Sequence, residues 1–503
     1  MSRIHYNERN GLSIDPIYME IEEPMSEGGI GMYGILIEKS SSLSVTRQIC
    51  QQLRDLIESG QLTAGTRLLP TRELAKDWGI ARNVVIEVYE QLTAEGYLDC
   101  RVGSGTYVAE GIVSTASLKI NPTVLDFKDE QDTTITQQDI IDFATGIPDI
   151  DLFPKNSWAK YLKDAAETDY NVDYGYGDIQ GDKKLRVAIR DYLYRAKGII
   201  CSSNQVMIVS GASEGISLIA QTLSNKFHSV YLEDPTIHFT RDIFQMMNYD
   251  IKPVDVDQNG MIVDSLPKLE DGHLLLLTPS HQFPTGSLLS IQRRQLAIHL
   301  ADQYDSYVIE DDYDSEFRLK GIPVPPLQTL SPNRVIYVGT FSKTLSPSLR
   351  IGFIIIPSHL IDAFATMKCK LNMYTSLNIQ RALSQFILDG QYERHIHSMK
   401  KVYKKRRNLL IDRLTHTFGN HISISGDDAG MHLQVQFQTK QYSNLPWNDT
   451  GSYGFRVEHS DDYKKSERPY QAGIILGYGN LHTDKIEEGV RRVHRFIMEK
   501  TNH

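Results

Sequence analysis

The chain has 503 residues, of which 41% are hydrophobic and 23% charged, and its 53 Lys and Arg against 63 Asp and Glu give a net charge of −10. At roughly 100–200 residues per domain, this length predicts more than one domain. The acidic balance excludes a general basic field, so any nucleic-acid contact must come from a local patch. Four cysteines without a CxxC pair favour a reducing, cytoplasmic setting and no metal site. No apolar run approaches the roughly 20 residues of a membrane span, which predicts no membrane contact.

The pattern of the chain divides it into four parts. Residues 1–38 have no clear period and are predicted to form an N-terminal extension. Residues 39–110 carry helical and short strand patterns, and residues 111–140, rich in Ser, Thr, Asp and Gln, are typical of a linker. Residues 141–503 alternate β-branched or leucine-rich runs with amphipathic stretches, which predicts an α/β domain with a mostly parallel sheet covered by helices.

Residues 39–110 predict a winged helix-turn-helix. Thr71 is placed to cap a second helix over Arg72–Trp78, a third helix is predicted over Arg82–Ala94, and two short strand patterns joined by a glycine turn follow. The third helix would enter the DNA major groove, and the hairpin would contact the DNA backbone. The predicted DNA contacts are Arg72, Arg82, Asn83, Arg101, Gly103, Ser104, Gly105 and Thr106. A packing module without DNA is the alternative, because helix-turn-helix geometry also occurs in such modules, and the nearly cancelling charges of this segment do not decide between the two.

The residues from Ser44 to Glu110 resemble the GntR family of bacterial regulators. The likeness rests on motifs in that family's order: Gly60-x-Leu62-x-x-Gly65-x-x-Leu68, Thr71-Arg72-Glu73-Leu74-Ala75, Arg82-Asn83, Tyr89-x-x-Leu92-x-x-Glu95-Gly96-Tyr97-Leu98 and Gly103-Ser104-Gly105-Thr106. Three positions depart from it, since Leu69 replaces a usual proline, Ala81 a serine and Val84 a threonine. Alanine at the start of the third helix removes an N-cap hydroxyl typically worth about 1 kcal/mol.

The most informative motif of the large domain surrounds Lys343. This lysine follows a predicted strand over Val335–Val338, is flanked by Ser342 and Thr344, and precedes Arg350 by seven residues. A lysine amine can form a Schiff base with pyridoxal phosphate, while small hydroxyls and an arginine suit the phosphate. A surface loop with a solvated lysine is the alternative for this motif taken alone.

Three further segments lie where strands are predicted to end. Val308–Tyr313 carries carboxylates, one of which can pair with a protonated pyridine nitrogen, and a tyrosine that can bond the phenolic oxygen of the cofactor. Val209–Gly215 runs from a strand into a helix, where backbone N–H groups suit a phosphate, and Thr278–Gly286 leaves another strand end. The alternatives are a metal site or helix-capping acidic cluster for the first segment and an ordinary glycine turn for the second.

In this order the segments resemble fold-type I aminotransferases over residues 141–503, and with the winged helix the chain resembles the MocR/GabR family of transcriptional regulators. The resemblance implies a homodimer with shared sites in which Lys343 carries pyridoxal 5'-phosphate as an internal aldimine. It further implies contacts to the pyridine nitrogen (Asp311), the phenolate oxygen (Tyr313), the phosphate (Ser342, Arg350, Ala212 and Ser213) and the neighbouring subunit's phosphate (Tyr176).

Two positions of the large domain depart from related regulators. Ile237 stands where an aromatic ring would stack on the pyridine, and Phe239 stands where GABA-responsive members place a carboxylate-binding arginine. A GABA-like ligand would lose a charge-assisted anchor worth roughly 1.5–3 kcal/mol. His238 or Phe239 can replace the stack and Arg456 or Arg468 the anchor, although a solvated surface position is the simpler expectation for both arginines.

A complete winged helix favours a transcriptional regulator over an enzyme. Such a regulator would bind operator DNA and sense a small amine or amino-acid effector, or pyridoxal phosphate itself, through Lys343. A working aminotransferase that carries a DNA-binding module is the alternative, because the same lysine serves proton transfer in catalysis. The basic run Lys400–Arg407 is expected to be a solvated helix face more than an extension of the DNA footprint.

Overall fold

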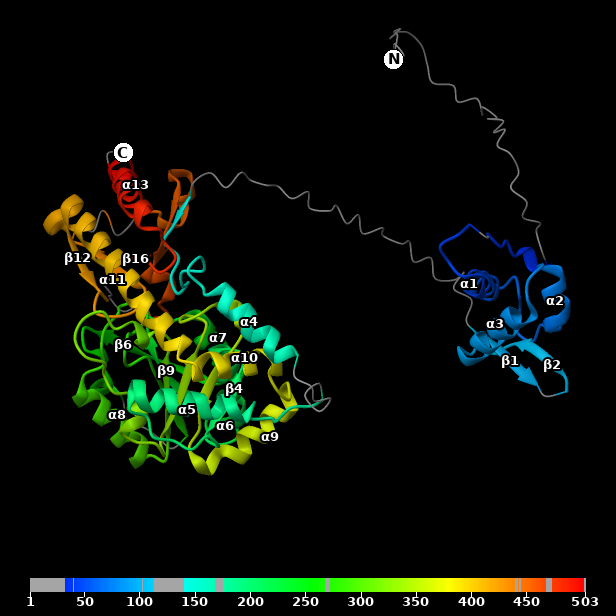
Figure 1. The fold of residues 1–503 in the computed structure, drawn as a ribbon, viewed down its shortest axis with the longest axis horizontal. Coiled ribbons are helices and arrows are strands. Elements are labelled where there is room, and N and C mark those ends of the chain that lie inside the picture. Colours follow the sequence, from blue (N-terminus) through cyan, green and yellow to red (C-terminus); the bar gives the residue numbers. More distant parts are fainter. Residues whose placement is uncertain are drawn as a thin grey trace, which may run out of the picture. The chain divides into compact units, whose positions relative to one another are not determined.

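The computed structural model describes residues 32–38, 40–101, 103–112, 140–167, 175–266, 272–438, 442, 445–466 and 473–501. The chain divides into two compact units, residues 1–133 and 134–503, which Figure 1 draws as ribbons. The first 31 residues of the predicted extension and residues 113–139 of the predicted linker lie outside the described residues.

The first unit is a bundle of three helices followed by a hairpin. Its elements are α1 (Val45–Glu58), α2 (Thr71–Asp77), α3 (Arg82–Ala94), β1 (Leu98–Arg101) and β2 (Gly105–Val108). The bounds predicted for the third helix are confirmed, and β1 pairs antiparallel with β2 so that Arg101 lies opposite Gly105. The predicted cap by Thr71 is wrong, because Pro70 takes the N-cap position of α2 and Thr71 is already helical.

Residues 32–38 pack onto this unit. Ile35 is buried in the same apolar cluster as the inner faces of α1, α2 and α3. The Trp78 indole N–H donates to the Met32 carbonyl at 3.1 Å, and the Leu69 backbone N–H donates to the Tyr33 hydroxyl at 3.2 Å. These contacts make the end of the predicted extension part of the packing of the first unit.

The second unit is built on a mixed sheet of eight strands in the order β4-β11-β10-β9-β8-β5-β6-β7. The strands are β4 (Val206–Val209), β5 (Ser229–Asp234), β6 (Asp250–Asp257), β7 (Gly260–Met261), β8 (His273–Leu277), β9 (Tyr307–Asp312), β10 (Val335–Thr340) and β11 (Gly352–Ile355). The neighbours from β6 through β10 run parallel, whereas β7 and β11 are antiparallel to their neighbours. The predicted α/β class with a mostly parallel sheet is confirmed.

Alternate residues of the central strands pack on opposite faces of this sheet. In β4, Val206 and Ile208 join one apolar cluster and Met207 and Val209 the other, as the two-residue period of a strand requires. The first face is covered by α4 (Lys155–Ala166), α5 (Lys183–Lys197) and α10 (Leu377–Leu388). The second is covered by α6 (Ala212–Leu223), α7 (His238–Met246) and α9 (Ile361–Leu371), and α8 (Ile291–Gln303) packs against β9. Burial on both faces explains why these strands read as continuous apolar runs.

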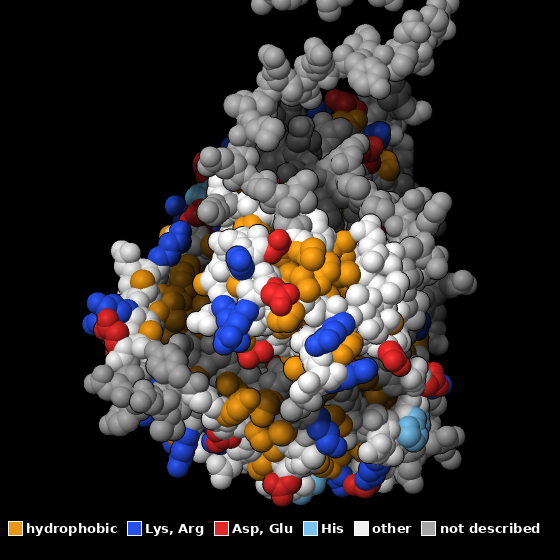
Figure 2. Space-filling view, turned by 90° about the vertical axis from the view of Figure 1, so that its right-hand side faces the viewer, with side chains coloured by type: hydrophobic (Ala, Val, Ile, Leu, Met, Phe, Trp, Pro, Cys, Tyr) orange, Lys and Arg blue, Asp and Glu red, His pale blue; other side chains and the backbone are white. Residues whose placement is uncertain are grey.

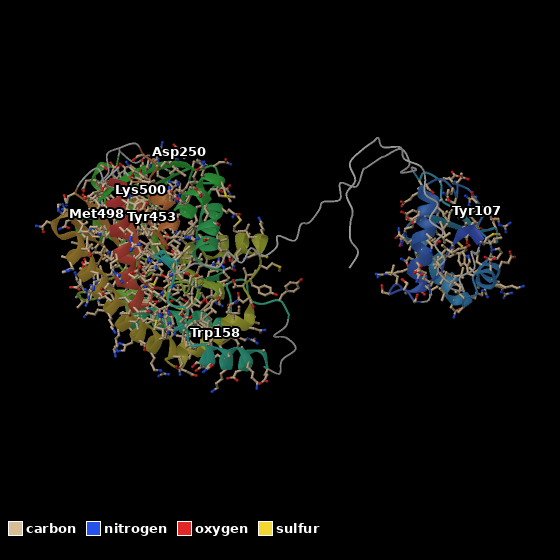
Figure 3. The ribbon with its side chains drawn as sticks, turned by 90° about the horizontal axis from the view of Figure 1, so that it is seen from above. Tyr107, Trp158, Asp250, Tyr453, Met498 and Lys500 are labelled. Carbon is tan, nitrogen blue, oxygen red and sulfur yellow. The ribbon has the colours of Figure 1, made fainter. Side chains whose placement is uncertain are left out.

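The C-terminal part adds a smaller sheet behind a long helix, α11 (Gln391–Phe418), which is yellow to orange in Figure 1. That sheet has the order β12-β13-β16-β15, and its strands are β12 (Ile422–Ser425), β13 (His432–Phe437), β15 (Glu458–His459) and β16 (Gly473–Gly477). A separate pair joins β3 (Ile141–Asp142) to β14 (Phe455–Arg456). The last helix, α13 (Thr483–Thr501), closes this part, and its Lys500 ammonium lies 5.8 Å from the centre of the Tyr453 ring (Figure 3).

Candidate functional site

A cavity of about 200 Å³ lies where β8, β9 and β10 end and α6 begins. Ligands in open α/β sheets bind at this edge, outside the carboxyl ends of the strands. All the predicted cofactor residues except Tyr176 line it: Lys343, Asp311, Tyr313, Ser342, Arg350, Ala212 and Ser213. The fold thus gathers residues spread over more than a hundred positions of the sequence.

The Lys343 amine is positioned by the backbone of a distant segment. Its Nζ donates to the Gly146 carbonyl oxygen at 2.8 Å. Gly146 has a φ of +67°, which side chains rarely allow, and a Cβ there would lie 2.7 Å from this Nζ, so the amine would have to shift. Burial lowers the pKa of Lys343, although the carboxylates of Asp314 and Asp311 oppose the effect. A larger fraction of this amine than of a surface lysine is therefore unprotonated and nucleophilic.

Asp311 presents an unsatisfied oxygen to the cavity. Its Oδ1 is buried and has no hydrogen-bond partner among the described residues. Burial, with the negative charges of Asp312 and Glu233, raises the pKa of Asp311 to about 7. A buried carboxyl with an open acceptor is stabilised by a cationic N–H group. The protonated ring nitrogen of pyridoxal phosphate supplies such a group, so the residues present fit that cofactor.

The opposite end of the cavity has the character of a phosphate site. The cavity reaches the N-terminus of α6 at Ala212 and Ser213, where backbone N–H groups lack helical acceptors. The Arg350 guanidinium lies beside it, since a Cβ on Gly211 would approach that guanidinium to 3.2 Å. Within the part of the chain that the structure describes, Arg350 makes no ion pair. A cation, hydroxyls and a helix N-terminus together suit a doubly charged phosphate.

Tyr313 belongs to a buried histidine cluster that the sequence did not suggest. Its hydroxyl donates to the His281 carbonyl oxygen at 2.8 Å, and the His281 ring pairs with Asp314 at 3.0 Å. Burial disfavours the charged ring, but the Asp314 carboxylate outweighs burial and raises the pKa of His281. Burial and the neighbouring His281 lower the pKa of His432 far below its ordinary value.

Asp314, His281 and His432 offer ligand atoms within 4.8 Å of one another. Metal ligands often gather in this way, but these groups already bond to protein atoms, since Asp314 accepts from His281 and His432 Nε2 faces the Pro284 carbonyl at 3.3 Å. Asp314 could have been predicted as a site residue because it directly follows Tyr313 in the sequence. No motif around His432 indicates a site, because this residue reaches the cavity from the smaller sheet.

The positions that depart from related regulators also border the cavity. Ile237 and Phe239 both line it, whereas the His238 ring stacks on Tyr463 with centres 4.6 Å apart. Of the two rings considered as replacements for the pyridine stack, only Phe239 therefore faces the cavity. Arg456 is exposed on β14 and does not line the cavity, and Arg468 lies outside the described residues.

Tyr176 is away from the cavity of its own chain. Its side chain is 82% exposed and makes an edge contact with Tyr374, with ring centres 6.2 Å apart. An aromatic side chain this exposed is free to contact another molecule.

The first unit places the predicted DNA contacts on one helix start and one hairpin. Arg72, Arg82 and Asn83 are exposed at the N-terminal ends of α2 and α3, and Arg82 Nε donates to the Thr71 hydroxyl at 3.3 Å. Ala81 is the N-cap of α3 and makes no side-chain cap, as its departure from the family pattern predicts. Residues 103–106 form the turn and the start of β2.

The hairpin also brings a cation that the sequence analysis missed. The backbone of Arg67 forms an isolated antiparallel β-bridge with that of Tyr107. The Arg67 guanidinium would lie 2.9 Å from a Cβ on Gly105. Arg101 lies over the same Tyr107 ring, 4.7 Å from its centre, and pairs with Asp99. Tyr107 is labelled in Figure 3. Arg67 was hidden because only its neighbours Gly65 and Leu68 belong to the motif.

The basic run of α11 divides into two groups. Arg406 is buried in an ion pair with Asp149 at 2.5 Å, and Arg407 is buried and donates to the Asp427 carbonyl. Lys401, Lys404 and Lys405 are exposed. The prediction of a single solvated face is wrong for the two arginines, which are buried in contacts with other segments of the domain. On the face drawn in Figure 2, Lys and Arg side chains lie interspersed with Asp and Glu.

The fold and the cavity define a class of protein in which a winged helix-turn-helix is joined to an aminotransferase-like domain. Residues 45–108 match the family of bacterial regulatory proteins, gntR family, and residues 138–445 match aminotransferase class I and II. The chain belongs to the MocR/GabR family of HTH-type transcriptional regulators, to which both matched domains and its full-length relatives point.

Two relatives and one solved structure illustrate this membership. The chain is 33% identical over 470 residues to the probable rhizopine catabolism regulatory protein MocR of Rhizobium meliloti, covering 91% of this chain and 94% of MocR. It is 30% identical over 454 residues to the pyridoxine biosynthesis regulator PdxR of Corynebacterium glutamicum, covering 90% and 96%. A Pyrococcus horikoshii kynurenine aminotransferase is 26% identical with a TM-score of 0.65, covering 72% of this chain and 91% of that one. Among the described residues, no helix is long and apolar enough to cross a membrane.

Proposed function

We propose that this protein is a pyridoxal-phosphate-dependent transcriptional regulator that binds operator DNA and senses an amine or amino-acid effector in the Lys343 cavity. One observation carries the proposal: the unpartnered Asp311 oxygen and the Lys343 amine border the same small cavity. The names of two relatives, a rhizopine catabolism regulator and a pyridoxine biosynthesis regulator, support two signals, an amine ligand or pyridoxal phosphate itself.

The chain's own residues would hold the cofactor at three points. Lys343 would bind it covalently, Asp311 would accept a hydrogen bond from its ring nitrogen, and Arg350 with the start of α6 would hold its phosphate. When bound, pyridoxal phosphate supplies an aldehyde that reacts reversibly with amines. An amine effector would therefore compete with Lys343 and release its amine. The Gly146 carbonyl oxygen is placed to accept a hydrogen bond from the released Nζ.

The release of Lys343 would affect DNA binding through a change in the arrangement of the two subunits of the dimer. Tyr176, exposed and unengaged by its own cavity, would complete the phosphate site of a neighbouring subunit. A cofactor site shared in this way changes when the two subunits shift relative to each other. If the effector-bound form favours one arrangement, the two DNA-binding modules change their spacing on a two-part operator.

On the DNA side, Arg82 and Asn83 at the start of α3 would read base edges in the major groove. Arg72 would bind the backbone beside them. Arg101 and the turn 103–106 would meet the backbone as the wing. Arg67 joins this set because its guanidinium lies against Gly105.

The cofactor half is tested by the visible absorption spectrum of the full chain with added pyridoxal phosphate. We expect a band near ~420 nm that Lys343→Ala abolishes, while Lys401→Ala, on the exposed face of α11, retains it. Titrating amino acids should shift the band and, in parallel, change operator affinity in the parent protein only. A Lys343→Ala variant that still responds fully would refute covalent sensing, and steady production of a keto acid would favour the aminotransferase alternative.

The DNA half is tested by operator binding at fixed salt. Arg82→Ala should weaken specific binding by about 1–3 kcal/mol, the range of a bidentate base contact. Arg491→Ala removes another exposed charge, from α13, and serves as the control, with no expected change. Equal losses in both variants would show that Arg82 acts only through net charge.

A further inference from the structure

A second cavity lies on the opposite side of the end of β9. Its volume is about 490 Å³, within the usual range of small-molecule sites. Asp311 and Asp312 are consecutive in β9, so their side chains point to opposite faces of the sheet. Asp311 borders the Lys343 cavity, whereas Asp312 holds a lysine, Lys197, that borders the second cavity. The end of β9 therefore borders the first cavity directly and is linked to the second through Lys197.

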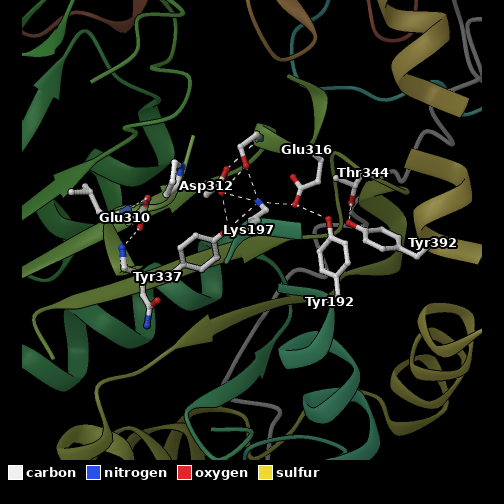
Figure 4. A network of polar contacts seen from close by, with 12 residues as sticks. Tyr192, Lys197, Glu310, Asp312, Glu316, Tyr337, Thr344 and Tyr392 are labelled. Carbon is white, nitrogen blue, oxygen red and sulfur yellow. Dashed lines mark hydrogen bonds and ion pairs between the residues drawn. The ribbon is translucent and has the colours of Figure 1, made fainter. Parts of the chain in front are cut away.

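Lys197 belongs to a buried polar network between the end of β9 and this cavity (Figure 4). The Lys197 ammonium pairs with Asp312 at 2.8 Å and with Glu316 at 2.7 Å. The Tyr337 hydroxyl donates to Asp312 at 2.7 Å. The other carboxylate that lines the cavity, Glu393, pairs with an arginine of α5. Each lining carboxylate thus has a cationic partner in the protein, although Glu316 shares Lys197 with Asp312.

Two further polar groups that line the cavity have hydrogen-bond donors without acceptors. The Ser280 Oγ and the Arg318 Nε are both buried and lack a hydrogen-bond partner among the described residues. Neither Arg318 nor Lys400 makes an ion pair with any residue the structure describes. Burial lowers the pKa of Lys400, so its ammonium would gain from a nearby negative charge. Unpartnered buried donors are rare because each costs free energy, and they call for an acceptor from outside the chain.

We propose that this second cavity binds a small organic anion, held through carboxylate or phosphate oxygens by Arg318, Lys400 and the Ser280 hydroxyl. Two cations and a hydroxyl lining one cavity match the oxygens of either group. The site is distinct from the Lys343 cavity, and it does not depend on whether that cavity senses an amine.

The position of the anion would let it influence the cofactor cavity. Ser280 directly precedes His281, whose carbonyl oxygen accepts from Tyr313. The positive charge of Arg318 acts against the protonated form of His281, so an anion on Arg318 would remove that opposition. Occupancy of the second cavity would then favour the protonated His281 ring beside Tyr313.

The test is calorimetric titration of the full chain, saturated with pyridoxal phosphate, with inorganic phosphate and separately with succinate at constant ionic strength. We expect one of the two probes to bind at one site per chain, which also distinguishes phosphate from carboxylate recognition. Arg318→Gln and Lys400→Gln should each weaken this binding by about tenfold or more, because each removes a charge-assisted contact. Lys401→Gln, the exposed neighbour on α11, is the matched control and should bind within about twofold of the parent.

Ser280→Ala keeps the test informative if Arg318→Gln disturbs folding. The serine hydroxyl has no partner among the residues that the structure describes, so its removal should leave thermal stability unchanged while weakening the probe several-fold. Failure of both probes to bind, or equal weakening by Lys401→Gln, would overturn the proposal. Binding that is lost with Arg350→Gln but kept with Arg318→Gln would place the anion in the Lys343 cavity and would also overturn it.

Discussion

Replacing Asp311 by asparagine measures how much the buried, unpartnered carboxyl lowers the free energy of unfolding when no cofactor is bound. In the folded, cofactor-free chain, burial raises the pKa of Asp311 from its ordinary 3.8 to about 7. Below pH 3.8 the carboxyl is protonated in both the folded and the unfolded chain and contributes nothing. Between these values the unfolded chain loses the proton first, so unfolding becomes easier as pH rises. Above pH 7 the full penalty applies, about 4 kcal/mol at roughly 1.4 kcal/mol per pH unit.

Asp311→Asn should therefore stabilise the cofactor-free large domain at pH 8 by up to about 4 kcal/mol and change little near pH 4. Scanning calorimetry of both proteins at the two pH values measures the difference. Added pyridoxal phosphate should reverse the order, raising the melting temperature of the parent more than that of the variant, because only the carboxylate adds a negative charge to its hydrogen bond with the protonated ring nitrogen.

The adjacent residue provides a control of opposite sign. Burial opposes ionisation of Asp312, but Lys197 outweighs burial and lowers the pKa of this carboxyl. Asp312→Asn leaves the buried Lys197 with Glu316 alone and removes the charged acceptor of the Tyr337 hydroxyl, so it should cost about 1.5–3 kcal/mol above pH 5. An Asp311→Asn variant as unstable as Asp312→Asn, or one without gain at pH 8, would refute the assignment of an unsatisfied acid to Asp311.

Two further substitutions test local geometry. Ala81→Ser should restore the missing N-cap of α3 and stabilise the DNA-binding module by about 1 kcal/mol, seen as a higher melting temperature of its transition; an unchanged transition would show that the cap is not limiting. Gly146→Ala places a Cβ 2.7 Å from the Lys343 amine at a φ of +67° and should weaken pyridoxal phosphate binding at least tenfold in spectroscopic titration. Unchanged cofactor affinity would mean that the Lys343 side chain can shift away from the added Cβ without losing the cofactor.

Local features of the sequence determined the DNA-binding module almost completely. Helix periodicity and glycine turns act within a few residues of each other, so the bounds of α3 were predictable without tertiary information. The cap of α2 was mispredicted because Pro70 and Thr71 both suit a helix start, and Pro70 takes the N-cap position without a side-chain cap. Arg67 was missed because its neighbour Tyr107 comes from another strand.

The cofactor cavity was predictable for a different reason. Asp311, Lys343 and the start of α6 all follow strands, and a parallel sheet brings the carboxyl ends of its strands to one edge. Motifs at several strand ends therefore specify one site even when they are far apart in the sequence.

Only the tertiary structure decided which face each side chain joins and which groups are left without partners. Gly146 and His432 enter the cavity from a loop and from a second sheet, and no local pattern marks them. Arg406 reads as one of several surface cations, yet it is buried on Asp149. The sequence records which groups can form hydrogen bonds and ion pairs, but whether Ser280 and Arg318 find partners depends on every segment that packs around them.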